Sequence, residues 1–312
     1  MTDNRENIFE AMSTDILNST LSEQEKNKML KNIQNLKNQE INLMITGATG
    51  SGKSSTINAL FDANVAKVGI SSDPETMDIT KYTLKNLILW DSPGLGDGTE
   101  ADARHSKNII KKLSETDSNG NYLIDLVLVI LDGSTRDYGT DYKLINQVII
   151  PNLGKDAADR ILVAINKCDK AKSRHWNYET NQPDEVAKKF LEEKVESVRH
   201  RIRENTGVDI EPIYYSAGEK DSDDEKQNPY NLSKLLYYII QHTPAEKRLT
   251  IMNNTSQEVD NWKDNQEPDI LDKIKDTAVD TAIKFIGEKI IEYFVPPVKI
   301  VKTFKKILDW FF

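Results

Sequence analysis

The stretch GATGSGKSSTINALF, residues 47–61, carries the pattern G-x-x-x-x-G-K-S over residues 47–54. An apolar run, INLMITG (41–47), precedes it and predicts a buried strand, and STINALF (55–61) has the spacing of a helix. A glycine-rich turn between a strand and a helix lets backbone N–H groups converge on an anion. The stretch therefore predicts a phosphate-binding loop in an α/β fold.

The residue types of this loop are those that hold a nucleoside triphosphate together with magnesium. Its glycines let the backbone amides face the β-phosphate, Lys53 would reach the β and γ oxygens, and the Ser54 hydroxyl can bind magnesium. We expect the nucleotide phosphates to be bound by Gly47, Gly50, Ser51, Gly52, Lys53, Ser54 and Ser55. The pattern predicts a nucleoside triphosphate without identifying its base.

A second phosphate-side element follows in NLILWDSPGLGDG, residues 86–98. An apolar strand is expected to end at Asp91, whose carboxylate can hold magnesium through a water molecule, and Gly94 lets its amide approach the γ-phosphate. The pattern D-x-x-G is common at strand ends, but here it follows the phosphate loop at a sensible distance. We therefore assign Asp91 to the metal site and Gly94 to the catalytic site.

A threonine between these two elements is expected to complete the magnesium site. Thr76, in GISSDPETMDITKY (69–82), can give its hydroxyl to magnesium and its amide to the γ-phosphate, so that its loop is ordered only when a triphosphate is bound. Ser72 and Thr80 are alternatives, and Thr76 is favoured because Thr80 opens the next apolar strand. The predicted catalytic residues are Lys53, Thr76 and Gly94, and the predicted metal ligands are Ser54, Thr76 and Asp91.

The base is predicted by ILVAINKCDK, residues 161–170, a buried strand that ends in the pattern N-K-x-D. Guanine presents its ring N–H and its exocyclic amine as adjacent donors, and the carboxylate of Asp169 can accept from both. Adenine offers one donor and one acceptor at that edge, so the same carboxylate would disfavour it. Asn166 can bind guanine and tie this loop to the phosphate loop, and the stem of Lys167 would lie over the base.

A further strand candidate ends in YYSAG, residues 214–218. It places Ser216 and Ala217 where the Ala217 amide can meet the guanine oxygen. The base-binding set is then Asn166, Lys167, Asp169, Ser216 and Ala217. Together these motifs predict a guanine nucleotide rather than an adenine nucleotide.

Composition divides the 312 residues into three segments. Residues 1–40 are polar and helix-prone, residues 41–245 alternate β-rich apolar runs with helical patterns, and residues 246–312 are helical to the end. The alternation predicts an α/β domain with a central, mostly parallel sheet of six strands, flanked by N- and C-terminal helical extensions. The strand candidates are INLMITG, KYTLKNLILWD, DLVLVILDG, RILVAINK and IEPIYYSA.

Charge and cysteine usage limit the classes of partner and compartment. The net charge of −9 disfavours DNA binding, and the single cysteine fits a reducing cytosol. The N-terminal residues lack the layout of a signal peptide, and no apolar run approaches the length of a bilayer span. We expect a cytoplasmic protein. Peripheral contact with the inner face of the membrane is a second expectation.

The ordered motifs resemble those of a known class of proteins. GATGSGKS, Thr76, DSPG, NKCD and SAG are similar to the five motifs of the translation-factor-type P-loop GTPases. GKSSTINALF with WDSPGLGDG resembles the Era-like branch, also labelled HSR1-related or 50S-ribosome-binding GTPases. The preceding helical pair, with DGSTRDYGTD after a strand, resembles a bacterial prophage-type subgroup of that branch. The resemblance covers roughly residues 20–250 and implies GTP/GDP and Mg2+ as cofactors.

Two functions of different classes follow from this resemblance. The first is a nucleotide-dependent switch that hydrolyses GTP to GDP and phosphate slowly, because Leu95 follows DSPG where Ras-like proteins carry a water-orienting glutamine. The second is a GTP-dependent self-assembling or membrane-associated scaffold in which hydrolysis is incidental. A homodimer that supplies Arg104 would raise turnover with protein concentration. Contact with ribosomes is implied by the family label, and the net acidity counts against it.

The C-terminal stretch VKIVKTFKKILDWFF, residues 298–312, has lysines on one side of a projected helix and Ile, Phe and Leu on the other. This arrangement suits a helix that lies in the plane of a membrane surface. It equally suits a helix that covers the domain or a dimer interface. Both interpretations stay open on the sequence alone.

Overall fold

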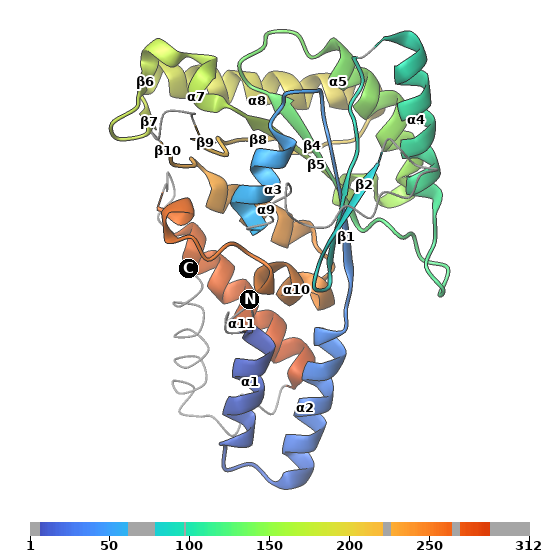
Figure 1. Ribbon diagram of the computed structural model, residues 1–312, viewed down its shortest axis with the longest axis vertical. Coiled ribbons are helices and arrows are strands. Elements are labelled where there is room, and N and C mark those ends of the chain that lie inside the picture. The colour runs from blue at the N-terminus through green and yellow to red at the C-terminus, as the bar shows by residue number, and fades with distance from the viewer. Residues whose placement is uncertain (1–6, 62–78, 97, 221–225, 264–268, 288–312) are drawn as a thin grey trace.

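A six-stranded sheet forms the centre of the computed structural model, which describes residues 7–61, 79–96, 98–220, 226–263 and 269–287 (Figure 1). The strand order is β2-β3-β1-β4-β5-β8, and only β2 runs antiparallel to its neighbour within this sheet. The strands are β1 (Ile41–Thr46), β2 (Thr80–Leu84), β3 (Leu87–Asp91), β4 (Leu126–Asp132), β5 (Ile161–Asn166) and β8 (Ile213–Tyr214). The predicted fold class is therefore confirmed.

The run KYTLKNLILWD, predicted as one strand, is a hairpin of β2 and β3. The strands pair antiparallel from Thr80 opposite Asp91 to Leu84 opposite Leu87. Lys85 turns the chain with a left-handed φ of 48°, and the Asn86 side chain donates to the Lys37 carbonyl. Asparagine is a common turn residue because its side chain bonds nearby backbone, and here that signal lies inside an apolar run.

Helices cover both faces of the sheet, which explains why β1, β4 and β5 are buried at nearly every position. Leu43 and Ile45 point into one apolar cluster, and Met44, between them, points into the other. The first face carries α3 (Lys53–Phe61) and α9 (Leu232–His242); the second carries α4 (Thr99–Ser114) and α8 (Glu185–Thr206).

The helical extensions pack on the α3 and α9 side of the sheet. Figure 1 shows α1 (Ile8–Leu17) and α2 (Glu23–Lys37) as a hairpin beyond the sheet, with α11 (Ile270–Ile286) beside it. Ser22 and Glu25 form the capping box expected from the sequence at the start of α2. The apolar side chains of α1, α2, α10 (Arg248–Asn253) and α11 join one core with those of α3 and α9. The division at residues 40 and 245 stays a prediction.

Short elements fill the connections around the sheet. They are α5 (Gly139–Lys143), a π-helix (Leu144–Ile149), α6 (Ala157–Arg160), α7 (Cys168–Ala171), and the paired strands β6 (Trp176–Asn177) with β7 (Gln182–Pro183) and β9 (Glu219–Lys220) with β10 (Lys226–Gln227). The remaining described elements are 3-10 helical turns at residues 150–152, 154–156, 173–175, 245–247 and 259–262.

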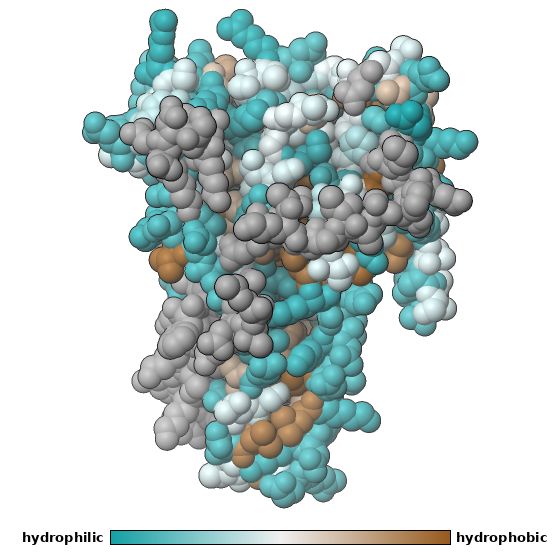
Figure 2. Space-filling view, viewed as in Figure 1, coloured by the Kyte–Doolittle hydropathy of each residue, from teal (hydrophilic) through white to brown (hydrophobic). Residues whose placement is uncertain are grey.

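Within the described residues, none of the helices combines the length and apolar character needed to cross a bilayer. Figure 2 shows hydrophilic side chains over much of the viewed face, with scattered hydrophobic residues. Thr76 and residues 298–312 lie outside the part of the chain that the structure describes, so the expectations for them stay predictions.

Candidate nucleotide site

The phosphate loop connects the end of β1 to the start of α3 and has a backbone that requires glycine. Gly47, Gly50 and Gly52 have φ values of 141°, 81° and 92°. A Cβ atom on Gly47 would lie 2.1 Å from the Ile130 carbonyl oxygen, so no other residue fits there. The loop is thus curled at the carboxyl end of β1, where ligands bind in open α/β sheets.

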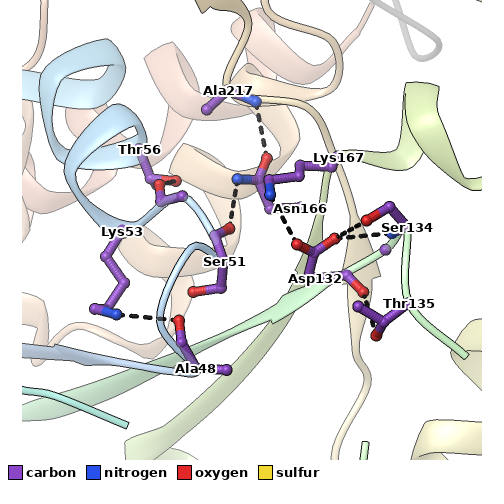
Figure 3. Close-up of polar contacts among 12 residues, drawn as sticks. Ala48, Ser51, Lys53, Thr56, Asp132, Ser134, Thr135, Asn166, Lys167 and Ala217 are labelled. Atoms are coloured by element: carbon purple, nitrogen blue, oxygen red, sulfur yellow. Dashed lines mark hydrogen bonds and ion pairs between the residues drawn. The ribbon is translucent and has the colours of Figure 1, made fainter. Parts of the chain in front are cut away.

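Lys53 lies inside this curl. Its Nζ atom donates to the carbonyl oxygens of Gly47 at 2.9 Å and Ala48 at 3.2 Å, and Figure 3 shows the second contact. Lys53 begins α3 and Ser54 follows it in the first turn. Both side chains are therefore presented at the N-terminal end of a helix, where backbone N–H groups favour negative charge.

Asp91 and Gly94 reach the loop from the neighbouring strand β3. Asp91 Oδ1 is buried and has no hydrogen-bond partner among the described residues. Burial raises the pKa of Asp91, and the nearby charge of Lys53 opposes that rise. A Cβ on Gly94 would lie 2.3 Å from the Gly47 carbonyl oxygen, so the DSPG turn and the phosphate loop are in direct contact.

Asp91 and Ser54 fit a magnesium ion that binds together with phosphate. A buried carboxylate oxygen without a partner is costly unless a cation or a donor satisfies it. Asp91 Oδ1 is such an oxygen, and the exposed Ser54 hydroxyl supplies a second ligand of the type magnesium prefers. In the described ranges no group of three or more His, Cys, Asp or Glu residues could hold a metal without further ligands. Magnesium sites with one or two protein ligands rely on substrate phosphates and water.

Asn166 connects the base-motif loop to two other loops. Its Nδ2 atom donates to the Ser51 carbonyl oxygen at 2.9 Å, and its Oδ1 atom accepts from the Ala217 amide at 3.0 Å (Figure 3). The Asn166 side chain is buried. A Cβ on Gly52 would come within 2.2 Å of Asn166 Nδ2, so the third loop glycine is required for this contact.

The other residues expected to bind the base already have contacts within the protein. The Ala217 amide, expected to meet the guanine oxygen, has its single N–H directed at Asn166. Ser216 lies two residues beyond the end of β8 and pairs through its backbone with Tyr230. Asp169 is buried, and its Oδ2 atom lies 3.7 Å from Lys170 Nζ.

Lys167 is held by a partner that the motif does not reveal. Its backbone is left-handed, with φ 56°, and its Nζ atom lies 2.7 Å from Asp132 Oδ2. Burial alone would raise the pKa of Asp132, but hydrogen bonds from Lys167 and Ser134 outweigh it and lower the pKa (Figure 3). The pair fixes the direction of the Lys167 stem, which the sequence predicts to lie over the base.

The segment DGSTRDYGTD, residues 132–141, also borders the phosphate loop. Lys194 of α8 donates to the carbonyl oxygens of Gly133 at 2.6 Å and Thr135 at 2.7 Å, which fixes the start of this segment. Asp141 at its end is buried, and burial raises its pKa to about 6, with the Ala48 backbone amide and the charge of Lys53 opposing the rise. In the sequence, the signal that could have pointed to this segment is its acidic character directly after a strand that ends beside the nucleotide motifs.

His105 and Arg104 on α4 are placed differently. His105 is buried and its Nδ1 atom lies 3.2 Å from the Gly94 carbonyl oxygen. Arg104, on the same helix, is exposed. His105 therefore contacts the DSPG turn, whereas Arg104 is exposed on the surface of the helix.

Residues 42–167 match the sequence model of a family described as 50S ribosome-binding GTPase. That segment holds the phosphate loop, the DSPG turn and the start of the base motif, and its fold is that of a P-loop GTPase.

Two curated proteins are similar in sequence to about half of the chain. Uncharacterized protein YkfA of Escherichia coli (strain K12) is 28% identical over 171 residues, 52% of this chain and 54% of that protein. Uncharacterized protein YfjP of the same organism is 29% identical over 150 residues, 46% of this chain and 47% of that protein. The chain thus spans about half the length of these curated relatives.

Two solved structures are similar to parts of the chain. Toc33 from Arabidopsis thaliana in complex with Mg2+ and GMPPNP has a TM-score of 0.41 and 16% identity, covering 67% of this chain and 85% of that chain. A probable GTP-binding protein engB has a TM-score of 0.39 and 21% identity, covering 64% of this chain and 97% of that chain.

Proposed function

We propose that the protein is a guanine-nucleotide switch that binds GTP with Mg2+ and hydrolyses it slowly to GDP and phosphate, as a member of the Era-like branch. One observation carries this proposal above the others. Asn166, from the base motif, donates to the Ser51 carbonyl of the phosphate loop and accepts from Ala217. A single buried amide thereby joins the loops that we propose to bind the base and the phosphates, and this supports the proposal.

Each predicted residue has a role in this proposal. Lys53 and the amides of residues 47–55 bind the phosphates, and Asp169 selects guanine by accepting its two donors. Ser54 and Asp91 hold magnesium, with Thr76 as the proposed third ligand. When bound, magnesium neutralises charge on the β and γ oxygens. Gly94 allows the DSPG backbone to approach the γ-phosphate because it already packs against Gly47.

A slow rate follows from Leu95. This residue follows DSPG, is buried, and belongs to the apolar cluster around α4. An aliphatic side chain cannot orient the attacking water, so that group must come from elsewhere in the chain or from a partner.

Calorimetry with full-length protein tests the proposal. We expect GDP and GTP to bind in the presence of Mg2+, ADP and ATP to bind at least about a hundredfold more weakly, as hydrogen-bond-based selection gives, and Lys53→Ala to lose GTP binding while its melting temperature is kept. Equal affinity for ATP and GTP, or unchanged GTP binding in the lysine variant, would contradict the proposal.

The alternative is a GTP-dependent scaffold, and it is favoured by the exposed position of Arg104 on α4. In a homodimer an exposed arginine can contact a second copy of the chain. Turnover per molecule should then rise with protein concentration, and Arg104→Ala should abolish the rise. Turnover per molecule that does not change with protein concentration would contradict the homodimer. Cytoplasmic location, contact with ribosomes and membrane contact through residues 298–312 are proposals to be tested by co-sedimentation with ribosomal subunits and with anionic vesicles.

A further inference from the structure

We propose that the hairpin of β6 and β7 is a clamp on the base site, in which Asn181 is a positioning residue that the selection of guanine requires. This inference rests on the proposed function. The hairpin spans residues 176–183, follows the base motif in the chain and contains none of the nucleotide motifs. It contacts the base motif through Tyr178, and through Asn181 it contacts the backbone partner of the SAG loop (residues 216–218).

Asn181 uses both ends of its side-chain amide. Its Nδ2 atom donates to the carbonyl oxygens of Asn228 and Pro229, each at 3.0 Å. Its Oδ1 atom accepts from Trp176 Nε1 at 3.3 Å and from Gln227 Nε2 at 3.4 Å. Its backbone is left-handed, with φ 52°, a conformation in which asparagine is enriched. Asn181 therefore joins its own hairpin to the segment that begins at Gln227.

The segment from Gln227 to Tyr230 is the backbone partner of the SAG loop. The Ser216 and Tyr230 backbones exchange two hydrogen bonds of 2.9 Å. Gly218 has a φ of 77°, and a Cβ on it would lie 2.5 Å from the Gln227 carbonyl oxygen. The position of the SAG loop therefore depends on this segment.

Trp176 supports the same segment through its ring. The buried rings of Trp176 and Tyr230 pack edge to face, with their centroids 4.9 Å apart. The two ends of the hairpin are also held together, because the Asp184 amide donates to the His175 carbonyl oxygen at 2.9 Å. An edge-to-face aromatic pair stabilises beyond the burial of its area. The hairpin is therefore a firm attachment for the segment that supports the SAG loop.

Tyr178 connects the hairpin to the base motif. Its hydroxyl donates to the backbone carbonyl oxygen of Asp169 at 3.3 Å, and Lys170 Nζ lies 5.6 Å from the centre of its ring. The same Lys170 Nζ lies 3.7 Å from Asp169 Oδ2. The hairpin thus contacts the residue that is proposed to accept from the two guanine donors.

The position of the hairpin between the two parts of the base site gives it a consequence for selectivity. Asp169 and the SAG loop follow different strands, β5 and β8. A displacement of about an ångström between cooperating groups can cost a large part of their effect. Because Tyr178 joins the hairpin to one part and Asn181 joins it to the support of the other, loosening the hairpin should weaken binding of the base. The phosphate contacts, assigned to residues 47–55, should stay.

The test compares GDP with ADP on full-length protein in the presence of Mg2+, with ADP measured by competition. Both nucleotides carry the same sugar and phosphates, so ADP reports the phosphate contacts and the ratio of the two affinities reports the base site. Asn181→Gly is the main variant, because glycine keeps a left-handed backbone and removes every side-chain contact. Tyr178→Phe removes only a hydroxyl. Tyr122→Phe is its matched control, since Tyr122 is 50% exposed, against 47% for Tyr178, and precedes the amino end of β4.

We expect Asn181→Gly to bind GDP about tenfold more weakly than wild type and to bind ADP equally well. Tyr178→Phe should lower the ratio about threefold, as the loss of one hydrogen bond gives, and Tyr122→Phe should leave it unchanged. Unchanged ratios in both hairpin variants, or a loss shared equally by GDP and ADP, would overturn the inference. If thermal unfolding shows that Asn181→Gly does not fold, Tyr178→Phe alone decides. A wild type that binds no guanine nucleotide, or binds GDP no more tightly than ADP, would instead overturn the proposed function.

Discussion

Replacing Asn166 with alanine should destabilise the protein and weaken nucleotide binding together. The substitution removes two hydrogen bonds, of 2.9 Å to the Ser51 carbonyl oxygen and of 3.0 Å from the Ala217 amide. It leaves both backbone groups without the partners they have in a buried environment. Each unsatisfied buried group costs about 1–3 kcal/mol, so we expect the free energy of unfolding to fall by about 3 kcal/mol.

The same substitution should lower GDP affinity by about tenfold or more, because Asn166 fixes the phosphate loop relative to the base loop, and misplacing groups by an ångström has effects of that size. Urea unfolding followed by tryptophan fluorescence gives the stability, and calorimetry gives the affinity. Asn119→Ala is the control, because Asn119 is exposed in a turn remote in sequence from the nucleotide motifs, and surface substitutions stay within about 0.5 kcal/mol.

Two outcomes would refute this reasoning. A loss of stability below about 1 kcal/mol would mean that the Ser51 and Ala217 groups find other partners or water. An unchanged GDP affinity with the expected loss of stability would mean that the loops keep their relative positions without Asn166, and the contact would then be structural alone.

Three further predictions concern other parts of the molecule. Asp169→Asn should shift preference from guanine toward xanthine nucleotides, because the amide can donate to the oxygen that replaces the guanine amine. Competition binding measures this preference, and an unchanged preference would contradict the assignment of Asp169 to the base site. Asn261→Ala should lower the free energy of unfolding by about 2 kcal/mol, because its buried Nδ2 atom donates to the Ala59 carbonyl oxygen at 3.1 Å and to Ser256 Oγ at 3.2 Å; chemical unfolding measures it, and a change within error would contradict the contact. Because burial raises the pKa of Asp141 to about 6, its ionisation opposes folding fully above pH 6, and the opposition disappears as the pH falls through 6 toward 4. Without nucleotide, Asp141→Asn should therefore be more stable than wild type at pH 8 by up to about 3 kcal/mol and no more stable near pH 4, as thermal unfolding across pH would show.

The parts of the site that the sequence predicted are those in which the motif and its supporting element are adjacent in the chain. The phosphate loop lies between β1 and α3 within residues 41–61, and Asn166 to Asp169 directly follow β5. Strand and helix patterns on either side then suffice to place the loop at a sheet edge. The predicted connection between Asn166 and the phosphate loop is present because both loops lie at that edge.

The contacts that the sequence missed join residues whose proximity depends on strand order. Asp132 ends β4 and lies opposite Asn166 in the parallel pairing of β4 with β5, which brings its carboxylate to Lys167. A pattern of apolar runs shows that two strands exist but not that they are neighbours. The β2–β3 hairpin was missed for a different reason, since Lys85 adopts a positive φ that its residue type does not signal.

The helix that begins at the phosphate loop is also fixed at its far end, which links the nucleotide domain to its C-terminal extension. The Ser256 amide donates to the Leu60 carbonyl oxygen at 2.7 Å, and Asn261 donates to the Ala59 carbonyl, so two carbonyls that end α3 are satisfied from a segment about 200 residues away. In the middle of α3, the buried hydroxyls of Thr56 and Tyr215 are 2.7 Å apart. The last carbonyls of a helix have no partner within it, and burying them unpaired would be costly. Residues 256–261 are therefore part of what holds α3, and with it Lys53 and Ser54, in place.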